Sequence, residues 1–466
     1  MADVTVVGGG LAGCEAAWQL AQRGHEVTLI EMRPVRRTPA HQTDRLAELV
    51  CTNSFKSEEL VNAHGLLKSE MRALGSLLLA AAEAARVPAG AALAVDRDIF
   101  SARMTEAVLA HPRIRVERRE LTVLPDGPAV IATGPLTSDA LTRAITELLG
   151  AGNLAFYDAI APIVSLESID LEHAFYASRY GKGEGEDYLN CPLDREQYIA
   201  FVEAIRAADT YPGHDWENIR FEQGREAPPP DDGTPYFEGC LPIEVLAARG
   251  IDALRFGPMK PVGLRDPRTG RTPYAVLQLR REDRAGQMWN LVGFQTRLRT
   301  GEQRRVFRMI PALANAEFLR YGSIHRNTYL NFPATLTPWG SPRGGRDDLI
   351  FAGQLTGVEG YTESAASGIL AGVNLDRIVR GEAPVLPPPT TMLGALYRYL
   401  RDGDPRDFQP MNSNFGLLDP LPDAPRDKRR RREQMVERAV AAFEAWARDN
   451  DIGPVSAEAP EAEVHA

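Results

Sequence analysis

A glycine-rich turn near the start of the chain constrains its fold more than any other feature. A short apolar run over residues 4–7 leads directly into Gly8, Gly10 and Gly13, which have the spacing GxGxxG. Residues 11–23 then repeat apolar side chains with helical spacing. In such a unit the first glycine permits the tight turn, the second lets a pyrophosphate approach, and the third lets the helix pack on the sheet. The pattern predicts a dinucleotide-binding βαβ unit.

The residues after this helix complete the unit and supply a candidate ribose ligand. Gly24 ends the helix, residues 27–30 form a second buried strand, and Glu31 stands 18 residues after Gly13. An acid at about this spacing hydrogen-bonds a ribose hydroxyl in dinucleotide sites. We therefore expect a cofactor site made of Gly8, Gly9, Gly10, Leu11, Ala12, Gly13 and Glu31.

The choice between FAD and NAD depends on how many such turns the chain has. The other glycine cluster, residues 181–185, is interleaved with Lys182 and Glu184 and opens no apolar helix, so we reject it as a second nucleotide site. A late apolar strand runs into Gly353 and Gln354, as in a flavin domain interrupted by insertions. We therefore predict that the cofactor is FAD and that Gly353 and Gln354 also contact it.

The 466 residues are enough for two to four structural units. Strands and helices alternate up to about residue 155, the next part is rich in turns, and an α/β pattern returns near residue 349. The fold class expected is α/β, a discontinuous Rossmann-type domain with an inserted α+β domain. We predict a FAD-binding domain over 1–155 and 328–400, an insert over 156–327 that binds substrate and tRNA, and a helical tail over 401–466 whose last residues are disordered. Helices are expected over 66–86, 96–110, 137–149 and 363–378.

Charge is distributed unevenly along the chain. The net charge is -10, but residues 255–326 hold 15 Lys and Arg against 5 Asp and Glu. This stretch therefore carries +10, and the remaining residues sum to -20. A basic region in an acidic protein is a plausible footprint for phosphates. The alternative is that these arginines solvate a surface or pair with acids elsewhere.

Several classes of protein are disfavoured by composition. The four cysteines form no CxxC pair, and the eight histidines show no HxxH spacing, so we predict no metal site. The first strand begins at Asp3, which leaves no room for a signal peptide, and the longest apolar run, residues 77–82, is too short for a membrane span. We therefore expect a cytoplasmic protein.

Two of the cysteines have the surroundings of reactive thiols. Cys51 and Cys240 lie beside glycine, proline or polar residues, outside any apolar helix. Cys14 lies in the first turn of the packed helix and is expected to be structural, whereas Cys191 is ambiguous. The residues alone leave open whether Cys240 is a nucleophile.

Longer segments resemble one known family, the folate- and FAD-dependent tRNA (uracil-5-)-methyltransferases, called TrmFO and earlier Gid. The resemblance covers most of residues 1–400. It is carried by VVGGGLAGCEAA (6–17), LVCTNSFKSE (49–58), YLNCPLD (188–194), YFEGCLPIE (236–244), LRFGPMKPVGL (254–264), LVGFQTRLRTGEQRRVF (291–307), FLRYGSIHRNTYLN (318–331) and FAGQLTGVEGYTESAASG (351–368).

The resemblance implies a FAD domain of the glutathione-reductase type and methylation of the T-loop uridine at tRNA position 54 to ribothymidine. It implies 5,10-methylenetetrahydrofolate as carbon donor and flavin reduced by NADH or NADPH. By motif, Cys240 would be the nucleophile at uracil C6. Cys51 would be its partner near the flavin, as a base or as a transient thiol guard. The basic stretch 255–326 would then be the tRNA surface, and no stable protein partner or membrane is implied.

Three alternatives remain. A related flavoenzyme modifies wobble uridine but has a long C-terminal helical domain, for which the 77 residues from 390 to 466 are too few. A flavin disulfide reductase needs a CxxxxC pair, which is missing from the sequence. An RNA-binding protein that keeps FAD as a relic would not need two loop cysteines.

Overall fold

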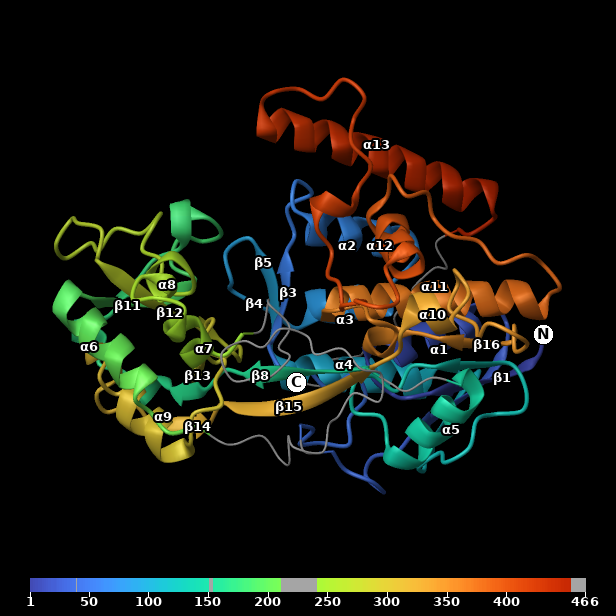
Figure 1. Cartoon of the computed structure of the whole chain (residues 1–466), viewed down its shortest axis with the longest axis horizontal. Coiled ribbons are helices and arrows are strands. Elements are labelled where there is room, and N and C mark those ends of the chain that lie inside the picture. The colour runs from blue at the N-terminus through green and yellow to red at the C-terminus, as the bar shows by residue number, and fades with distance from the viewer. Residues whose placement is uncertain (39, 151–153, 211–240, 454–466) are drawn as a thin grey trace, which may run out of the picture.

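The computed structural model describes residues 1–38, 40–150, 154–210 and 241–453, and Figure 1 shows two groups of elements joined by a long two-stranded ribbon. The first group is built on a parallel sheet of order β16-β7-β1-β2-β6. Its strands are β1 (Asp3–Val7), β2 (Glu26–Glu31), β6 (Ile114–Arg118), β7 (Ala129–Ile131) and β16 (Leu349–Phe351). Because β16 pairs with β7, a segment from late in the chain completes a sheet begun by the first residues.

Alternate residues of this sheet point to opposite faces, as the strand period requires. Val130 and Ile350 belong to one core, and Ile131 and Phe351 belong to another. The helices that cover the two faces are α1 (Leu11–Gln22) and α11 (Tyr361–Val379) on the first, and α5 (Asp139–Leu149) on the second. The two helices of the first face pack closely, since a Cβ on Gly368 would lie 2.1 Å from the carbonyl oxygen of Ala12.

A small antiparallel sheet of order β3-β5-β4 and three helices also belong to the first group. They are β3 (Ser54–Ser57), β4 (Arg86–Val87), β5 (Ala92–Val95), α2 (Ala63–Ala73), α3 (Leu77–Ala84) and α4 (Arg97–Ala110). The single helix expected over 66–86 is wrong. Gly75 has φ +69, and Ser76 caps α3 by accepting a hydrogen bond from the Leu79 amide, so the chain breaks into two helices there.

The second group is an antiparallel sheet of order β10-β11-β12-β13-β9-β14. Its helices pack on the sheet through buried aromatic side chains such as Phe201 and Phe307. The strands are β9 (Ile163–Ser165), β10 (Phe175–Tyr176), β11 (Tyr188–Leu193), β12 (Ala275–Arg281), β13 (Met288–Leu291) and β14 (Phe318–Arg320). The helices are α6 (Arg195–Arg206), α7 (Ile243–Ala248), α8 (Ala253–Phe256) and α9 (Thr300–Phe307). We call this group the insert.

The ribbon between the groups consists of β8 (Leu154–Ile160) and β15 (Ser323–Tyr329), which pair in antiparallel fashion. Figure 1 shows both strands crossing from the insert to the parallel sheet. The predicted boundaries at 155/156 and 327/328 fall inside these two strands. The domain limits remain a prediction, because the chain passes between the groups without a linker at either point.

The last helices lie on the first group. They are α10 (Phe332–Thr335), α12 (Met392–Asp402) and α13 (Lys428–Asp449). In Figure 1, α13 runs along the outside of α2 and α12, and its residues Phe443 and Trp446 join the same core as α1. Residues 454–466, expected to be disordered, lie outside the described part of the chain. No helix among the described residues is long and apolar enough to cross a membrane.

Candidate functional site

A cavity opens at the carboxyl edge of the parallel sheet, where open α/β sheets bind ligands. It has about 1040 Å³ of empty space, including its opening to solvent. All but one of the predicted cofactor residues line it. They come from the β1–α1 turn, the end of β2 and the start of the short 3-10 helix Gly353–Thr356: Gly8, Gly9, Gly10, Leu11, Ala12, Glu31, Gly353 and Gln354. The exception, Gly13, does not line the cavity, because it packs under the turn.

The glycines of the turn have different functions. A Cβ on Gly13 would lie 1.8 Å from the Gly8 carbonyl oxygen, and one on Gly8 would lie 2.5 Å from that of Ala132. These two positions therefore require glycine for packing. A Cβ on Gly10 would meet no atom within 4 Å, so this residue faces open space in the cavity. Gly10 is also the N-cap of α1, and no side chain caps that helix. Uncapped amides at a helix start favour an anionic group such as a pyrophosphate.

The carboxylate of Glu31 is already engaged in holding the turn. Its Oε2 accepts the Gly9 amide at 2.8 Å, and its Oε1 accepts the Arg33 amide and Nε, both at 2.9 Å. Burial alone would raise the pKa of Glu31, but the hydrogen bonds and charge of Arg33 outweigh it and hold that pKa below its usual range. The acid is therefore ionised and fixed in orientation. Because Oε2 accepts only one of these bonds, it keeps a lone pair, and a ribose contact stays a prediction.

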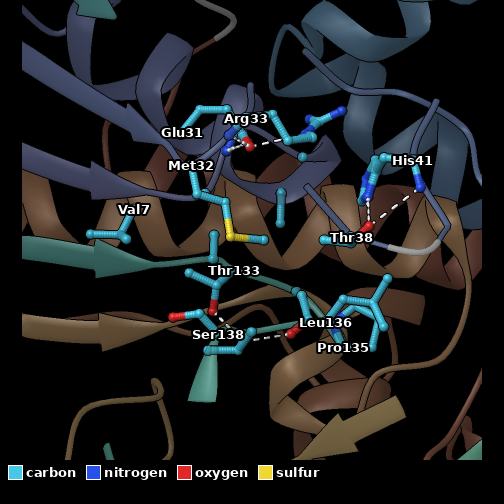
Figure 2. A pocket seen from close by; sticks show the side chains of 18 of the residues that line it. Val7, Glu31, Met32, Arg33, Thr38, His41, Thr133, Pro135, Leu136 and Ser138 are labelled. Carbon is cyan, nitrogen blue, oxygen red and sulfur yellow. Dashed lines mark hydrogen bonds and ion pairs between the residues drawn. The ribbon is translucent and has the colours of Figure 1, made fainter. Parts of the chain in front are cut away.

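Other walls of the cavity were not predicted from the sequence. Figure 2 shows Thr133 and Ser138 across the cavity from Glu31, and Thr38 beside His41 on a third side. The Thr133 hydroxyl lies 2.6 Å from that of Thr137. The Thr133–Ser138 segment follows β7, so the rule that ligands bind beyond the ends of parallel strands could have found it.

The late segment closes the cavity at the start of α11. Gly353 has φ +78, and its amide donates to the Ser367 hydroxyl at 2.6 Å. The Gln354 side chain donates to Glu359 at 2.6 Å, and Tyr361 and Ser364 of α11 also line the cavity. The structure therefore places the two predicted late residues beside the turn that starts the chain.

Cys51 lies in a loop held through its backbone next to this wall. The Tyr361 hydroxyl accepts the amide of Cys51 at 2.7 Å and the amide of Thr52 at 3.3 Å. Arg97 donates to the carbonyl oxygens of Leu49 at 3.0 Å and of Cys51 at 3.2 Å. Two backbone donors and two backbone acceptors around Cys51 are thus fixed by side chains from α4 and α11.

The insert contacts the same loop from the other side. Arg320 donates to the Val50 carbonyl oxygen at 2.8 Å. Arg280 donates to Thr52 at 2.8 Å and to Asn53 at 3.0 Å. Both groups of elements therefore form hydrogen bonds to the loop that contains Cys51. Arg97 and Arg320 hold this loop from both groups of elements, through the carbonyl oxygens of Cys51 and Val50.

The remaining cysteines differ from Cys51. Cys14 is fully buried, with its thiol donating to the Gly9 carbonyl oxygen at 3.5 Å, and Cys191 is buried within the sheet of the insert. Burial raises the pKa of both thiols, so both are inert. Cys240 lies outside the described residues. Among the residues that the structure does describe, no group of His, Cys, Asp and Glu could hold a metal ion.

The basic stretch 255–326 divides into internal and external arginines. Arg280, Arg284 and Arg320 make hydrogen bonds to the first group of elements and hold the insert in place. In contrast, α9 and the residue after it expose Arg304, Arg305 and Arg308 to solvent. The local charge excess of the sequence is thus only partly available to a phosphate backbone.

Comparison with known proteins identifies relatives over nearly the whole chain. The family model described as glucose inhibited division protein A matches residues 3–383. A Geobacter sulfurreducens protein named methylenetetrahydrofolate–tRNA-(uracil-5-)-methyltransferase TrmFO is 55% identical over 95% of this chain and 98% of its own length. A Moorella thermoacetica protein of the same name is 54% identical over 95% and 97%, respectively.

Solved structures are similar at the level of the fold. Aquifex aeolicus GidA in its form II crystal has a TM-score of 0.67 and 16% identity, and the match covers 97% of this chain and 73% of that one. Its form I crystal gives a TM-score of 0.66 over 97% and 76%. The predicted fold class, a Rossmann-type α/β domain with an insert, is confirmed by this similarity together with the parallel sheet.

Proposed function

Because the chain belongs to the TrmFO family of methylenetetrahydrofolate–tRNA-(uracil-5-)-methyltransferases, we propose that it methylates C5 of a uridine in tRNA. The uridine is that of the T-loop at position 54, and the product is ribothymidine. The carbon comes from 5,10-methylenetetrahydrofolate. The reductant is FAD that has been reduced by NADH or NADPH. The observation that carries the proposal is the 51–55% identity to eight relatives of this name across nearly the full chain.

The cavity fits FAD. Open space beside Gly10, the uncapped start of α1 and the fixed carboxylate of Glu31 suit a pyrophosphate and a ribose. Gly353, Gln354 and the start of α11 extend the cavity toward Cys51, where the ring system of a dinucleotide would lie. Bound there and reduced by NADH or NADPH, the flavin would supply the hydride that turns a methylene group into a methyl group.

Thiol chemistry explains why the chain needs reactive cysteines. Uracil C5 is a poor nucleophile, and a thiolate that adds to C6 turns it into an enolate-type carbon that attacks an electrophilic one-carbon unit. A base then removes the C5 proton while the bond between the new carbon and its carrier's amine breaks, so that the amine leaves and an exocyclic methylene remains on C5. A hydride adds to this methylene to make the methyl group, and the thiolate is expelled from C6 as the C5–C6 double bond re-forms. We assign the nucleophile to Cys240 and a role beside the flavin to Cys51, as base or thiol guard. The hydrogen bonds that fix the Cys51 loop support the role proposed for Cys51, because they hold this residue next to the cavity wall.

The main rival is the related flavoenzyme that modifies wobble uridine. The two GidA structures share the fold at 16% identity, which carries no information about the substrate. The relatives named TrmFO are more than three times as similar in sequence and are covered almost completely. We therefore favour the T-loop substrate and propose that the protein works in the cytoplasm, where its tRNA substrate is found.

A label-transfer assay tests the proposal. Methylene-labelled methylenetetrahydrofolate, unmodified tRNA and NADH or NADPH are incubated with the purified protein, and tRNA nucleosides are analysed. We expect label in ribothymidine of the T-loop. Flavin that is present and reducible without label in tRNA would refute the substrate assignment. Cys240→Ala is expected to keep its flavin and make no product, and full activity of that variant would remove Cys240 as the nucleophile.

A further inference from the structure

An exposed tyrosine directly precedes the glycine cluster of residues 181–185, which we rejected as a nucleotide loop. Tyr180, the residue before it, has φ +58 and ψ +23, a left-handed conformation that residues with a large side chain rarely adopt. The residue is 71% exposed, so burial of the ring does not compensate for this strain. A strained backbone that persists at the surface marks a position selected for something other than stability.

One face of the Tyr180 ring rests on a glycine. A Cβ on Gly263 would lie 2.8 Å from the Tyr180 ring, so only glycine allows this approach. The Tyr180 amide donates to the Gly263 carbonyl oxygen at 3.0 Å, and Arg179 donates to the carbonyl oxygen of Val262 at 2.7 Å. The ring is therefore held flat against one loop while most of its surface faces solvent.

The loop that carries the ring is rigidly built. Asp187 is 2% exposed and accepts hydrogen bonds from the Ser178 hydroxyl at 2.8 Å and the Glu184 amide at 3.1 Å. The Ser178 amide donates to the Gly185 carbonyl oxygen at 2.6 Å, which closes the loop. An aromatic ring fixed in this way loses little conformational entropy when a flat ligand stacks on it.

Contacts with the first group of elements fix where the loop lies. The Lys182 ammonium bonds both oxygens of Glu59, at 2.5 and 2.7 Å, and the Tyr188 hydroxyl donates to the Ala89 carbonyl oxygen at 3.0 Å. Glu59 comes two residues after β3, in the segment that follows the Cys51 loop. The exposed ring therefore lies where the insert meets the side of the molecule that carries Cys51.

The surroundings of the ring favour a nucleic acid as the partner. Val262, 57% exposed, extends the apolar surface, and the exposed Lys260 and Arg265 have no acidic partner among the described residues. Unpaired bases of RNA are recognised by stacking on aromatic rings beside cations that contact phosphates. The charge of Lys182 is already matched by Glu59, so the ring rather than net charge distinguishes this surface.

We propose that Tyr180 is a stacking platform for an unpaired base of the tRNA substrate, with Lys260 and Arg265, which flank the Gly263 segment in the sequence, for the adjoining phosphates. The proposal rests on the tRNA-directed function argued above and adds a specific contact on the insert. It differs from the arginine face of α9, whose contribution would be purely electrostatic.

Tyr180→Asn tests this contact, because asparagine tolerates the left-handed backbone and removes the ring. The probe is a T-arm hairpin RNA with its unpaired loop, compared with a blunt duplex of the same stem. We expect Tyr180→Asn to bind the hairpin about 5- to 150-fold more weakly, the range for one base–aromatic stack, and the duplex equally well. The salt dependence of binding should not change, since stacking releases no counterions. Tyr180→Phe should bind like the wild type.

Leu171→Asn, which also removes an exposed apolar side chain from the insert, is the matched control and should have no effect. Flavin content shows that each variant is folded. If Tyr180→Asn binds the hairpin as tightly as the wild type while the wild type transfers label to tRNA, the stacking proposal is wrong and the proposed function stands. If the wild type transfers no label and binds no hairpin, both are wrong.

Discussion

Arg97 joins the Cys51 loop to Glu282 of the insert: its Nε lies 2.7 Å from Glu282 Oε2, and its Nη2 donates to the Cys51 carbonyl oxygen. The Glu282 side chain is 2% exposed, so this ion pair is shielded from solvent. A single guanidinium thus connects an acid of one group of elements to the backbone of the candidate catalytic residue in the other. The orientation of the insert and the position of Cys51 are coupled through it.

Glu282→Gln should therefore impair both stability and activity. Removing one partner of a buried ion pair leaves an uncompensated charge and costs about 3–5 kcal/mol. We expect a lower melting temperature and slower ribothymidine formation, with flavin retained because Glu282 does not line the cavity. Glu302→Gln is the control, since Glu302 pairs with the exposed Arg305, and such surface pairs contribute below about 1 kcal/mol. Equal melting temperatures for the two variants would contradict the coupling.

Alanine substitutions at two glycines of the turn should affect different properties, flavin binding at Gly10 and also the stability of the apoprotein at Gly13. A methyl group on Gly10 would enter open cavity space, and its φ of -79° suits alanine. Gly10→Ala should therefore fold normally but lose flavin. A methyl group on Gly13 would meet the Gly8 carbonyl oxygen, so Gly13→Ala should lower the stability of the apoprotein as well. Flavin absorbance and thermal unfolding of the apoproteins measure both effects. Full flavin content in Gly10→Ala would argue against the turn as the cofactor site.

The parts of the fold that the sequence could predict are those governed by short-range patterns. The turn at Gly8, the helix after it and the strand ending at Glu31 follow from periodicity and spacing, and the structure has them as expected. The break at Gly75 was missed, because a glycine inside an apolar helical pattern is usually tolerated. The small sheet β3-β5-β4 was missed because its strands have at most four residues.

The site shows the same division. Cys51 could be singled out from its neighbours in the sequence, but its partners could not. Arg97, Arg320 and Tyr361 lie 46, 269 and 310 residues away along the chain, and only the folded structure brings them to one loop. The basic stretch predicted a local excess of positive charge but not which arginines are exposed. Spacing in the sequence does not distinguish an arginine that contacts the other group of elements from one that faces solvent.

Buried Glu70 predicts a pH dependence of stability. Its carboxylate accepts the amides of Met392 at 2.7 Å and Leu393 at 2.8 Å at the start of α12, with no cation beside it among the described residues, and burial raises its pKa to about 8. The folded state thus binds a proton that the unfolded state releases above its ordinary pKa of 4.5. This stabilisation is complete below that value and is lost as the pH rises toward 8.

Denaturant unfolding at pH 5 and pH 8.5 compares the wild type with Glu70→Gln, which stays neutral throughout. We expect the wild type to lose more stability than the variant between the two pH values. Glu70 of the wild type ionises in the unfolded chain at pH 8.5, whereas the glutamine of the variant has no charge at either pH. The same loss in both proteins would mean that Glu70 is ionised in the folded state. Glu147→Gln, at an exposed position of α5, controls for the general effect of removing an acid.

The exposed arginines of α9 give the most direct test of the tRNA surface. Arg304, Arg305 and Arg308 lie on one exposed face, as their spacing of three and four residues requires. Replacing all three by glutamine should weaken tRNA binding and flatten its salt dependence, by about 0.7–0.9 in the log–log slope for each phosphate that an arginine no longer neutralises. Arg103→Gln, on the exposed side of α4, should leave both unchanged. Because counterion release depends on how many phosphates are neutralised and not on base sequence, the triple variant should weaken binding equally for T-arm and unrelated RNA. An unchanged slope would mean that these arginines only solvate the surface of the insert.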